Sequence, residues 1–290
     1  MPKKIFLLAM SFLITACTQA LLTTVNVPTE FDDNKIIRDV AYGSDASQKM
    51  DIYTPANSGD KKMDVIVFLY GGRWSFGTKE DYQFVGAAFA NQGYITVIPD
   101  YRKYPAVHFP IFVDDSAKAL AWVYDHIAAY HGEPDHIFLV GHSAGAHIGA
   151  LLATDTHYLI AEGKKTSDVI HGFIGLAGPY AFTPDEPDLE DMFGPPANYP
   201  KMQATTFVDG HQPPMLLLRG SEDATVKPLN LDRLEQAIRE RGGYVQSITY
   251  PHTDHVDILG DLTWLGNSHA PVRSDITKYI HTIDGRTVTN

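Results

Sequence analysis

The feature that most constrains the fold is a short pattern of glycines around a serine near the middle of the chain. The stretch Gly141-His142-Ser143-Ala144-Gly145 follows an apolar run, residues 136–140, and precedes a segment of small residues, 146–153. This order predicts a strand, a tight turn with Ser143 at its apex, and a helix. The flanking glycines let the strand turn directly into the helix without Cβ clashes. The pattern therefore predicts an exposed serine hydroxyl on a constrained turn.

Strand and helix patterns alternate from residue 65 onward, which predicts an α/β fold with a mostly parallel central sheet and helices on both faces. Strands are expected at 36–42, 49–53, 65–70, 94–99, 136–140, 170–176, 215–219 and 244–250. Helices are expected at 82–92, 113–131, 146–153, 229–241, 256–265 and 273–282. We expect a single domain over 35–290. The stretch 178–212, rich in Pro, Asp and aromatic residues, has no clear period and is expected to be a lid-like insertion over the strand ends.

Three candidate catalytic residues, Ser143, Asp223 and His255, each come after a predicted strand. The carboxyl ends of parallel strands meet at one edge of a sheet, so these three side chains are expected to lie together. A serine hydroxyl becomes a nucleophile when an imidazole takes its proton, and the imidazole needs a carboxylate to fix its tautomer. The sequence therefore predicts a Ser143–His255–Asp223 triad.

Other residues compete for two of these positions. Glu222, Asp188 and Asp209 are rivals of Asp223 as the acid, and His252 is the rival of His255 as the base. Asp223 is preferred because its turn, Gly220 to Asp223, directly follows a clean strand.

The loop Tyr70-Gly71-Gly72-Arg73-Trp74 is the candidate oxyanion hole, together with the amide of Ala144. It directly follows the predicted strand 65–70. Adjacent glycines allow backbone N–H groups to point inward without obstruction by side chains, and such groups stabilise the negative charge that develops during acyl transfer.

These motifs resemble the esterase/lipase branch of the α/β-hydrolase superfamily, which includes BD-FAE-like, hormone-sensitive-lipase-like and kynurenine-formamidase-like enzymes. The resemblance covers about residues 35–282, and its matching stretches are 70–74, 100–105, 141–145, 220–223 and 254–255. By similarity, the amides of Gly72 and Arg73 join that of Ala144 as oxyanion donors. The resemblance implies a serine carboxylesterase that cleaves a small or medium carboxylic ester through an acyl-enzyme, with no metal and no organic cofactor.

The chain departs from the pattern of that branch at two positions. Tyr70 stands where the family has His, and Arg73 stands where many members have Gly. The first change removes a loop-bracing imidazole, which a tyrosine hydroxyl is able to replace. Asp100 and Arg102 are expected to form a structural ion pair behind the site. Four side chains are expected to contact the substrate: Trp74, Phe76, His142 and Tyr180.

The N-terminus has the pattern of an export signal. Lys3 and Lys4 precede a short apolar run that ends in Ile14-Thr15-Ala16-Cys17, which resembles a bacterial lipobox. Residues 1–16 are therefore expected to be a signal peptide, Cys17 the lipidated residue and 17–34 an irregular tether. The expected location is the cell envelope, at the periplasmic face of the outer membrane. The alternative is a soluble periplasmic or secreted protein with a plain cleaved signal.

The charge balance limits the classes of partner. The chain has 23 Lys and Arg against 35 Asp and Glu, a net charge of −12. Nucleic acid and anionic lipid surfaces are therefore not expected to bind its body, and membrane contact is expected only through Cys17. The expected partner is a small-molecule ester. Hydrolysis of an amide or formamide, acyl transfer, and a non-catalytic binding lipoprotein are the alternatives.

Overall fold

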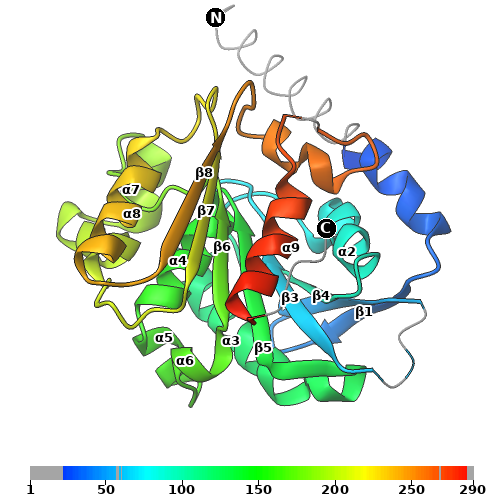
Figure 1. Ribbon diagram of the computed structural model, residues 1–290. Coiled ribbons are helices and arrows are strands. Elements are labelled where there is room, and N and C mark those ends of the chain that lie inside the picture. The colour runs from blue at the N-terminus through cyan, green and yellow to red at the C-terminus, as the bar shows by residue number, and fades with distance from the viewer. Residues whose placement is uncertain (1–21, 57–58, 60, 268, 286–290) are drawn as a thin grey trace, which may run out of the picture.

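Eight strands form one sheet through the middle of the protein (Figure 1). The computed structural model describes residues 22–56, 59, 61–267 and 269–285. Across the sheet the strand order is β1-β2-β4-β3-β5-β6-β7-β8. The bounds are β1 Lys35–Ala41, β2 Lys49–Thr54, β3 Met63–Leu69, β4 Ile95–Pro99, β5 Gly132–His142, β6 Gly172–Leu176, β7 Met215–Gly220 and β8 Val245–Tyr250.

The six strands from β3 to β8 run parallel, and β1 and β2 form an antiparallel edge. Because the six are parallel, their carboxyl ends lie at one edge of the sheet. The register aligns Leu69 with Gly141, His142 with Leu176, and β7 with β8 up to their last residues. The loops that follow these strands therefore start close together.

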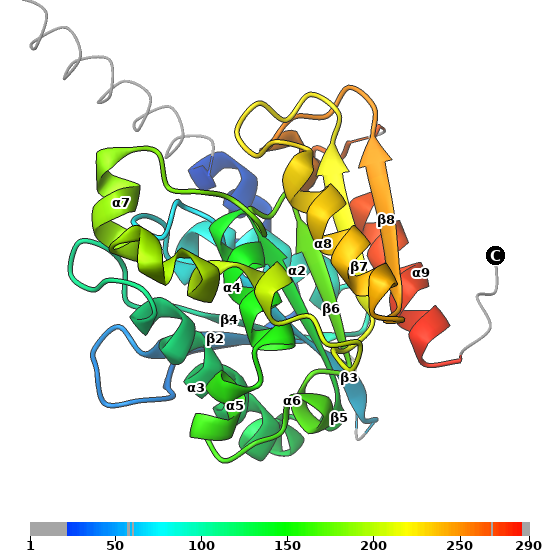
Figure 2. The ribbon, with the colours of Figure 1, turned by 90° about the vertical axis from the view of Figure 1, so that its left-hand side faces the viewer.

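Helices cover both faces of the sheet, as the sequence predicts. The helices α2 (Gln83–Ala90) and α9 (Val272–Ile283) lie on one side, and α4 (Ala144–Thr154) and α8 (Leu229–Glu240) on the other (Figures 1 and 2). The helix α3 (Ile111–His126) packs beside α4. This arrangement confirms the predicted α/β fold.

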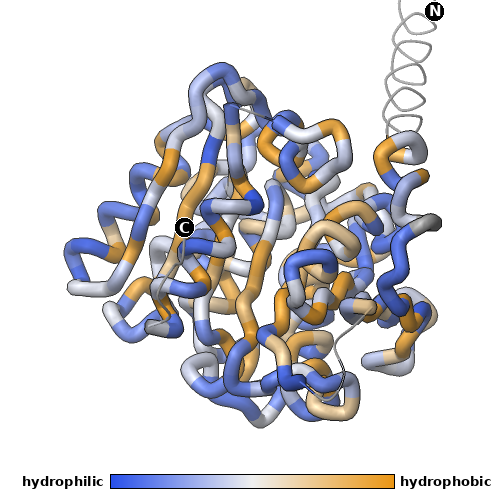
Figure 3. The backbone as a smooth tube through the Cα atoms, turned by 45° about the vertical axis from the view of Figure 1, so that its right-hand side comes forward, coloured by the Kyte–Doolittle hydropathy of each residue, from blue (hydrophilic) through white to orange (hydrophobic). Residues whose placement is uncertain are grey.

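The apolar patterns in the sequence account for what is buried. Every residue of β3 is buried, as expected for a central strand covered on both faces. The hydropathy view shows the central strands as the most apolar part of the chain, with polar loops outside them (Figure 3). On α9, a one-sided stripe is buried against the sheet: Val272, Ile276, Tyr279 and Ile280.

Part of the segment expected to be an irregular tether is helical. Residues 22–26 form helical turns, and a 3₁₀ helix, η1, follows at Val27–Phe31. The amide side chain of Asn26 accepts from the N–H of Phe84 and donates to the carbonyls of Glu80 and Asp81, at 2.9–3.1 Å. These bonds hold the segment against the start of α2, so the expectation of irregular structure is wrong for residues 22–31.

The insertion at 178–212 contains more regular structure than its sequence indicates. It includes α7 (Pro187–Phe193) and two 3₁₀ helices, η4 (Pro196–Met202) and η5 (Ala204–Thr206). The buried side chains of α7 are Leu189, Met192 and Phe193, which do have helical spacing, but the run is too short to stand out among the prolines and acidic residues. Two other short helices were also not expected: α5 (His157–Ala161) and α6 (Thr166–Val169).

Within the part of the chain that the structure describes, no helix is long and apolar enough to cross a membrane. The predicted signal peptide, residues 1–16, and Cys17 lie outside the described residues.

The expected ion pair between Asp100 and Arg102 is not formed, because Arg102 pairs with Asp115 on α3. The guanidinium donates two bonds to that carboxylate, at 2.8 and 2.7 Å, and the backbone N–H of Arg102 donates a third at 3.0 Å. Gln48 donates a fourth at 2.7 Å. The Asp115 side chain is 2% exposed, so this network anchors the segment after β4 to the buried face of α3.

We predict that Asp115→Ala lowers the free energy of unfolding by about 3 kcal/mol, because it leaves the buried amide of Gln48 and the partly buried donors of Arg102 without their acceptor. Asp125→Ala is the matched control on the same helix, since Asp125 pairs with Lys164 and is 48% exposed. The Asp125→Ala variant should lose less than about 1 kcal/mol of unfolding free energy. Urea unfolding followed by circular dichroism measures both. Equal losses in the two variants would contradict the role given to Asp115.

Candidate active site

Ser143 lies at the junction of β5 and α4, in the turn that the sequence predicts. Its backbone angles are φ 53° and ψ −120°, a strained combination for a residue with a side chain. Its N–H donates to the carbonyl of Leu176 at 2.9 Å, which holds the turn against the end of β6. A Cβ at Gly141 would overlap the carbonyl oxygen of Gly145, and a Cβ at Gly145 would overlap that of Leu69. Both glycines are therefore required by close backbone packing.

His255 and Asp223 lie in line with the serine. The Nε2 atom of His255 is 2.8 Å from Ser143 Oγ, and its Nδ1 atom is 2.8 Å from Asp223 Oδ2. The structure thus brings together three residues that are far apart in the sequence. The side chain of Asp223 is 1% exposed and that of His255 is 13% exposed, and Ser143 is partly exposed, so the line leads outward from a buried acid.

The environment of Asp223 keeps it ionised. Burial on its own would raise the pKa of this carboxyl, but the bond from His255 and the N–H groups of Val226 and Thr225 outweigh burial and lower it. Those two amides donate to Asp223 Oδ1 at 2.8 and 2.9 Å. Because an ionised carboxylate only accepts hydrogen bonds, His255 carries its proton on Nδ1 and leaves the Nε2 lone pair directed at Ser143.

The loops that carry the acid and the histidine are fastened to each other. The N–H of Glu222 donates to the carbonyl of Thr253 at 3.0 Å, and that of Ser221 donates to the carbonyl of Tyr250 at 2.8 Å. A Cβ at Gly220 would overlap the carbonyl oxygen of Thr253, so only glycine permits this approach. Asp254 then accepts from the N–H groups of residues 256 and 257 and holds the chain just after His255.

The rival residues lie elsewhere. His252 and Glu222 pair with each other at 3.1 Å at the surface, where they are 75% and 61% exposed. Asp188 pairs with Arg73, and Asp209 accepts from the N–H of His211 in its own turn. None of these three acids bonds to the ring of His255 in the described contacts, so Asp223 and His255 are the pair that the geometry favours.

The candidate oxyanion loop adopts an unusual conformation next to the serine. Three successive residues, Gly72, Arg73 and Trp74, have positive φ angles of 121°, 52° and 55°. A Cβ at Gly71 would lie 3.0 Å from Ser143 Cβ, which shows how closely the loop passes the turn. Ala144 is the first residue of α4, where backbone N–H groups have no partner within the helix and carry partial positive charge. Loop and helix end thus meet beside Ser143.

Tyr70 takes over the bracing that a histidine would supply at this position. Its hydroxyl donates to Asp100 Oδ1 at 2.5 Å, and its carbonyl accepts from the hydroxyl of Tyr101 at 3.0 Å. Its ring stacks between Tyr82 and Tyr101, with centroid distances of 5.2 and 4.9 Å. Asp100 is therefore a partner of the loop rather than of Arg102.

The Arg73 side chain is tied to the insertion. Its guanidinium bonds Asp188 at 3.1 Å and Glu186 at 2.8 Å, and both acids lie at the start of α7. These bonds raise the pKa of Arg73 although burial opposes them. The cation that the sequence places near the site is thus neutralised by two carboxylates, and it links the oxyanion loop to the insertion.

Two of the expected substrate contacts are core residues in the structure. Trp74 is 4% exposed and lies in a cluster of aromatic rings, with its indole 4.9 Å from the ring of Phe193 and 5.1 Å from that of His147. Tyr180 is 1% exposed and packs over Gly175 and Gly178, where any Cβ would collide with its ring or hydroxyl. Both side chains support the site from behind.

The other two expected contacts differ from each other. Phe76 is 67% exposed, so it lies at the surface. His142 is 5% exposed, and its Nε2–H donates to the carbonyl of His255 at 2.9 Å. Burial, reinforced by repulsion from His255, lowers the pKa of His142 to about 3, so its ring stays neutral over the working pH range. His142 therefore positions the backbone of His255 and does not line an open surface.

The sequence contained no signal for this role of His142. Its partner is 113 residues away, and a histidine beside the serine does not indicate which carbonyl it reaches. The role of Asp254 in holding the chain just after His255 could have been predicted, because Asp254 directly precedes His255 in the matching stretch 254–255.

The strand order, the helices on both faces and the serine on a strand–helix turn define an α/β-hydrolase fold. The sequence model of the BD-FAE family matches residues 50–238, well over half of the chain, and the chain therefore belongs to that family.

Comparison with known proteins gives relatives among esterases. An isoprenylcysteine alpha-carbonyl methylesterase, ICME, of Arabidopsis thaliana is 28% identical over 254 residues, which cover 79% of this chain and 58% of the relative. Esterase LipC of Mycobacterium tuberculosis is 27% identical over 234 residues, with coverages of 72% and 57%. The chain spans just over half the length of these curated relatives.

Among solved structures, esterase B of Lactobacillus Rhamnosis superposes with a TM-score of 0.80. The superposition covers 98% of this chain and 97% of the other, at 19% sequence identity. At that identity the likeness establishes the shared fold.

We predict that His142→Phe lowers kcat about fivefold with little change in KM, because the loss of one hydrogen bond to the His255 backbone is worth about 1 kcal/mol. The kcat pH profile should keep its shape, since His142 is neutral throughout. Steady-state kinetics on p-nitrophenyl acetate between pH 5 and 9 measure both. His126→Phe is the control, since His126 also bonds a carbonyl, that of Trp122, on the surface of α3. Unchanged kcat in His142→Phe would rule out the positioning role.

Proposed function

We propose that this protein is a carboxylesterase that works through an acyl-enzyme on Ser143. The observation that carries the proposal is the unbroken line of two 2.8 Å contacts from Asp223 through His255 to Ser143 Oγ. Such a line needs a nucleophile, a base and an acid in matching orientations. Ligand binding alone does not require a nucleophile aligned with a base and an acid, so this alignment disfavours the alternative of a non-catalytic lipoprotein.

The proposed reaction begins when Ser143 Oγ attacks the ester carbonyl carbon. His255 Nε2 takes the hydroxyl proton, and Asp223 stabilises the imidazolium that forms. The carbonyl oxygen becomes an oxyanion, and in this proposal the N–H groups of Gly72, Arg73 and Ala144 donate to it. Collapse of the tetrahedral intermediate breaks the ester bond, and the leaving alkoxide takes the proton from His255.

Water completes the cycle. His255 removes a proton from a water molecule, the hydroxide attacks the acyl carbon, and a second tetrahedral intermediate releases the carboxylic acid and returns the proton to Ser143. Each step uses groups of this chain and water. The names of the relatives, a methylesterase and esterases, support an ester rather than an amide as the bond that is cleaved.

The proposed substrate is a small or medium carboxylic ester. Arg73, next to the serine turn, pairs with Glu186 and Asp188 at the start of α7. These bonds support a substrate site that is bounded on its outer side by the insertion, with the charge of Arg73 neutralised. Lipidation at Cys17 and attachment to the cell envelope stay predictions from the sequence.

We predict that Ser143→Ala lowers the hydrolysis of p-nitrophenyl butyrate by at least about 10⁴-fold, because the reaction loses its nucleophile. Circular dichroism and thermal unfolding should match the unaltered protein, since removal of the hydroxyl relieves rather than adds crowding at the turn. Ser167→Ala is the matched control, an exposed serine on α6 whose hydroxyl bonds Asp168. Activity within about tenfold of normal in a folded Ser143→Ala variant would exclude the proposed mechanism.

A further inference from the structure

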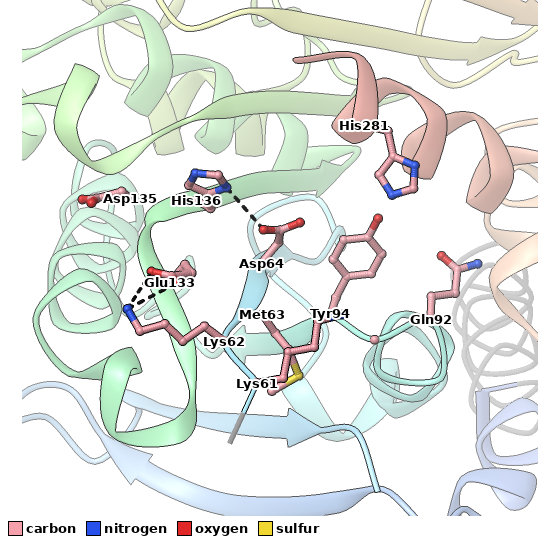
Figure 4. A pocket seen from close by; sticks show the side chains of 11 residues that line it. Lys61, Lys62, Met63, Asp64, Gln92, Tyr94, Glu133, Asp135, His136 and His281 are labelled. Atoms are coloured by element: carbon pink, nitrogen blue, oxygen red, sulfur yellow. Dashed lines mark hydrogen bonds and ion pairs between the residues drawn. The ribbon is translucent and has the colours of Figure 1, made fainter. Parts of the chain in front are cut away.

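A second group of chemically reactive side chains lies at the opposite edge of the sheet from Ser143. A hollow of about 620 Å³ opens there, beside the amino-terminal ends of β3 and β5. Figure 4 shows Asp64 of β3 and His136 of β5 directed at each other in this hollow, with His281 of α9 across from them. Nothing in the proposed esterase reaction uses these residues.

Two of the side chains that line the hollow, Asp64 and His136, offer ligand atoms to the same point as Asp284, which lies at the end of α9. Asp64, His136 and Asp284 place a carboxylate oxygen, an imidazole nitrogen and a second carboxylate oxygen within 4.8 Å of one another. His136 Nδ1 lies 3.3 Å from Asp64 Oδ1 and 3.7 Å from Asp284 Oδ1. The three come from separate elements, because Asp284 is the C-cap of α9.

These spacings match those around a metal ion. Ligand atoms bound at about 2.0–2.1 Å to a tetrahedral Zn²⁺ are about 3.3 Å apart from each other. The two distances from His136 Nδ1 are near that value. The two carboxylate oxygens lie within 4.8 Å of each other, and they would move closer together to bind one ion.

Burial gives a second reason for a cation at this point. The Asp284 side chain is 1% exposed and that of Asp64 is 7% exposed. Two buried carboxylates so close together repel each other and cost free energy unless positive charge offsets them. A divalent ion at this point would lie against both carboxylates and offset both charges. Lys62, also in the hollow, pairs with Glu133 at 3.2 Å.

His171 adds an outer contact typical of metal sites. Its Nε2 lies 3.0 Å from Asp284 Oδ1, and its ring stacks on that of His136 with centroids 4.8 Å apart. Its backbone N–H donates to Ile137 at 2.8 Å, which fixes it beside β5. Groups that bond to metal ligands from outside fix the orientation of those ligands.

We propose that Asp64, His136 and Asp284 bind one divalent transition-metal ion of the Zn²⁺ type. The imidazole favours such an ion over Mg²⁺ or Ca²⁺, which prefer oxygen ligands alone. With three protein ligands, a water molecule would supply the fourth ligand of a tetrahedral site. The ion fastens the end of α9 to β3 and β5, so its role is structural. No motif in the sequence indicates a metal here, and this site is separate from the esterase chemistry.

The test uses the purified protein without a polyhistidine tag, treated with a chelator and then dialysed. Isothermal titration calorimetry with ZnCl₂ should give one site per chain, and Zn²⁺ should raise the melting temperature by several degrees. Mg²⁺ at the same concentration should leave the melting temperature unchanged. His136→Gln should weaken Zn²⁺ binding at least about 100-fold, and His171→Gln about tenfold.

His157→Ala is the control for chance binding at the surface, since His157 is exposed and pairs with Asp155 at 2.6 Å, away from the proposed site. It should keep the full response to Zn²⁺. Asp284→Asn provides a second variant, and wild-type titration decides the outcome if either variant fails to fold. The proposal is overturned if the chelated wild-type protein binds no Zn²⁺ at one per chain, or if His136→Gln keeps the wild-type affinity.

Discussion

The structure depends on one close approach of backbones, where the turn at Ser143 meets the end of β3. A side chain at Gly145 would collide with the carbonyl of Leu69, so the helix after the serine packs directly on the strand next to it. The same strand continues into the loop from Tyr70 to Trp74. The contact at Gly145 therefore sets the distance between Ser143 and the oxyanion loop. It also holds the strained backbone of Ser143. The short distance and the fixed turn are both needed where a tetrahedral intermediate would form.

Much of the fold and of the site could be predicted because the signals are local. Apolar runs and the glycines around Ser143 mark the strands and the turn within a few residues, and parallel strands force the loops that follow them to one edge. The acid and the base of the triad could be predicted because both come directly after strands that end at that edge. Asp223 could be separated from Asp188 and Asp209 because it follows a strand, whereas those two lie in the insertion. The rivals Glu222 and His252 follow the same strands as Asp223 and His255, and the structure separates them by placing them at the surface.

The parts that could not be predicted depend on contacts between distant residues. Arg102 is paired with Asp115 instead of Asp100 because α3 packs against the segment after β4. The bond from His142 to the carbonyl of His255 requires knowing how two loops sit together. Short helices such as α7 owe their stability to packing rather than to their own sequence, so their weak pattern was missed. The replacement of a family histidine by Tyr70 was visible, but its bond to Asp100 was not.

The two edges of the sheet carry different chemistry. The carboxyl edge holds the serine, its partners and an insertion tied down by Arg73, while the amino edge holds buried carboxylates and imidazoles that tie α9 to the sheet. Since α9 packs on η6 (Asp257–Leu262), which begins two residues after His255, the stability of one edge supports the geometry of the other.

The most direct test of the central claim is to treat the protein with an alkyl fluorophosphonate and locate the adduct by mass spectrometry. The geometry at Ser143 predicts one adduct per chain, on the peptide that contains Ser143, and loss of esterase activity in step with labelling. An adduct on a different residue, or full activity after complete labelling, would contradict it.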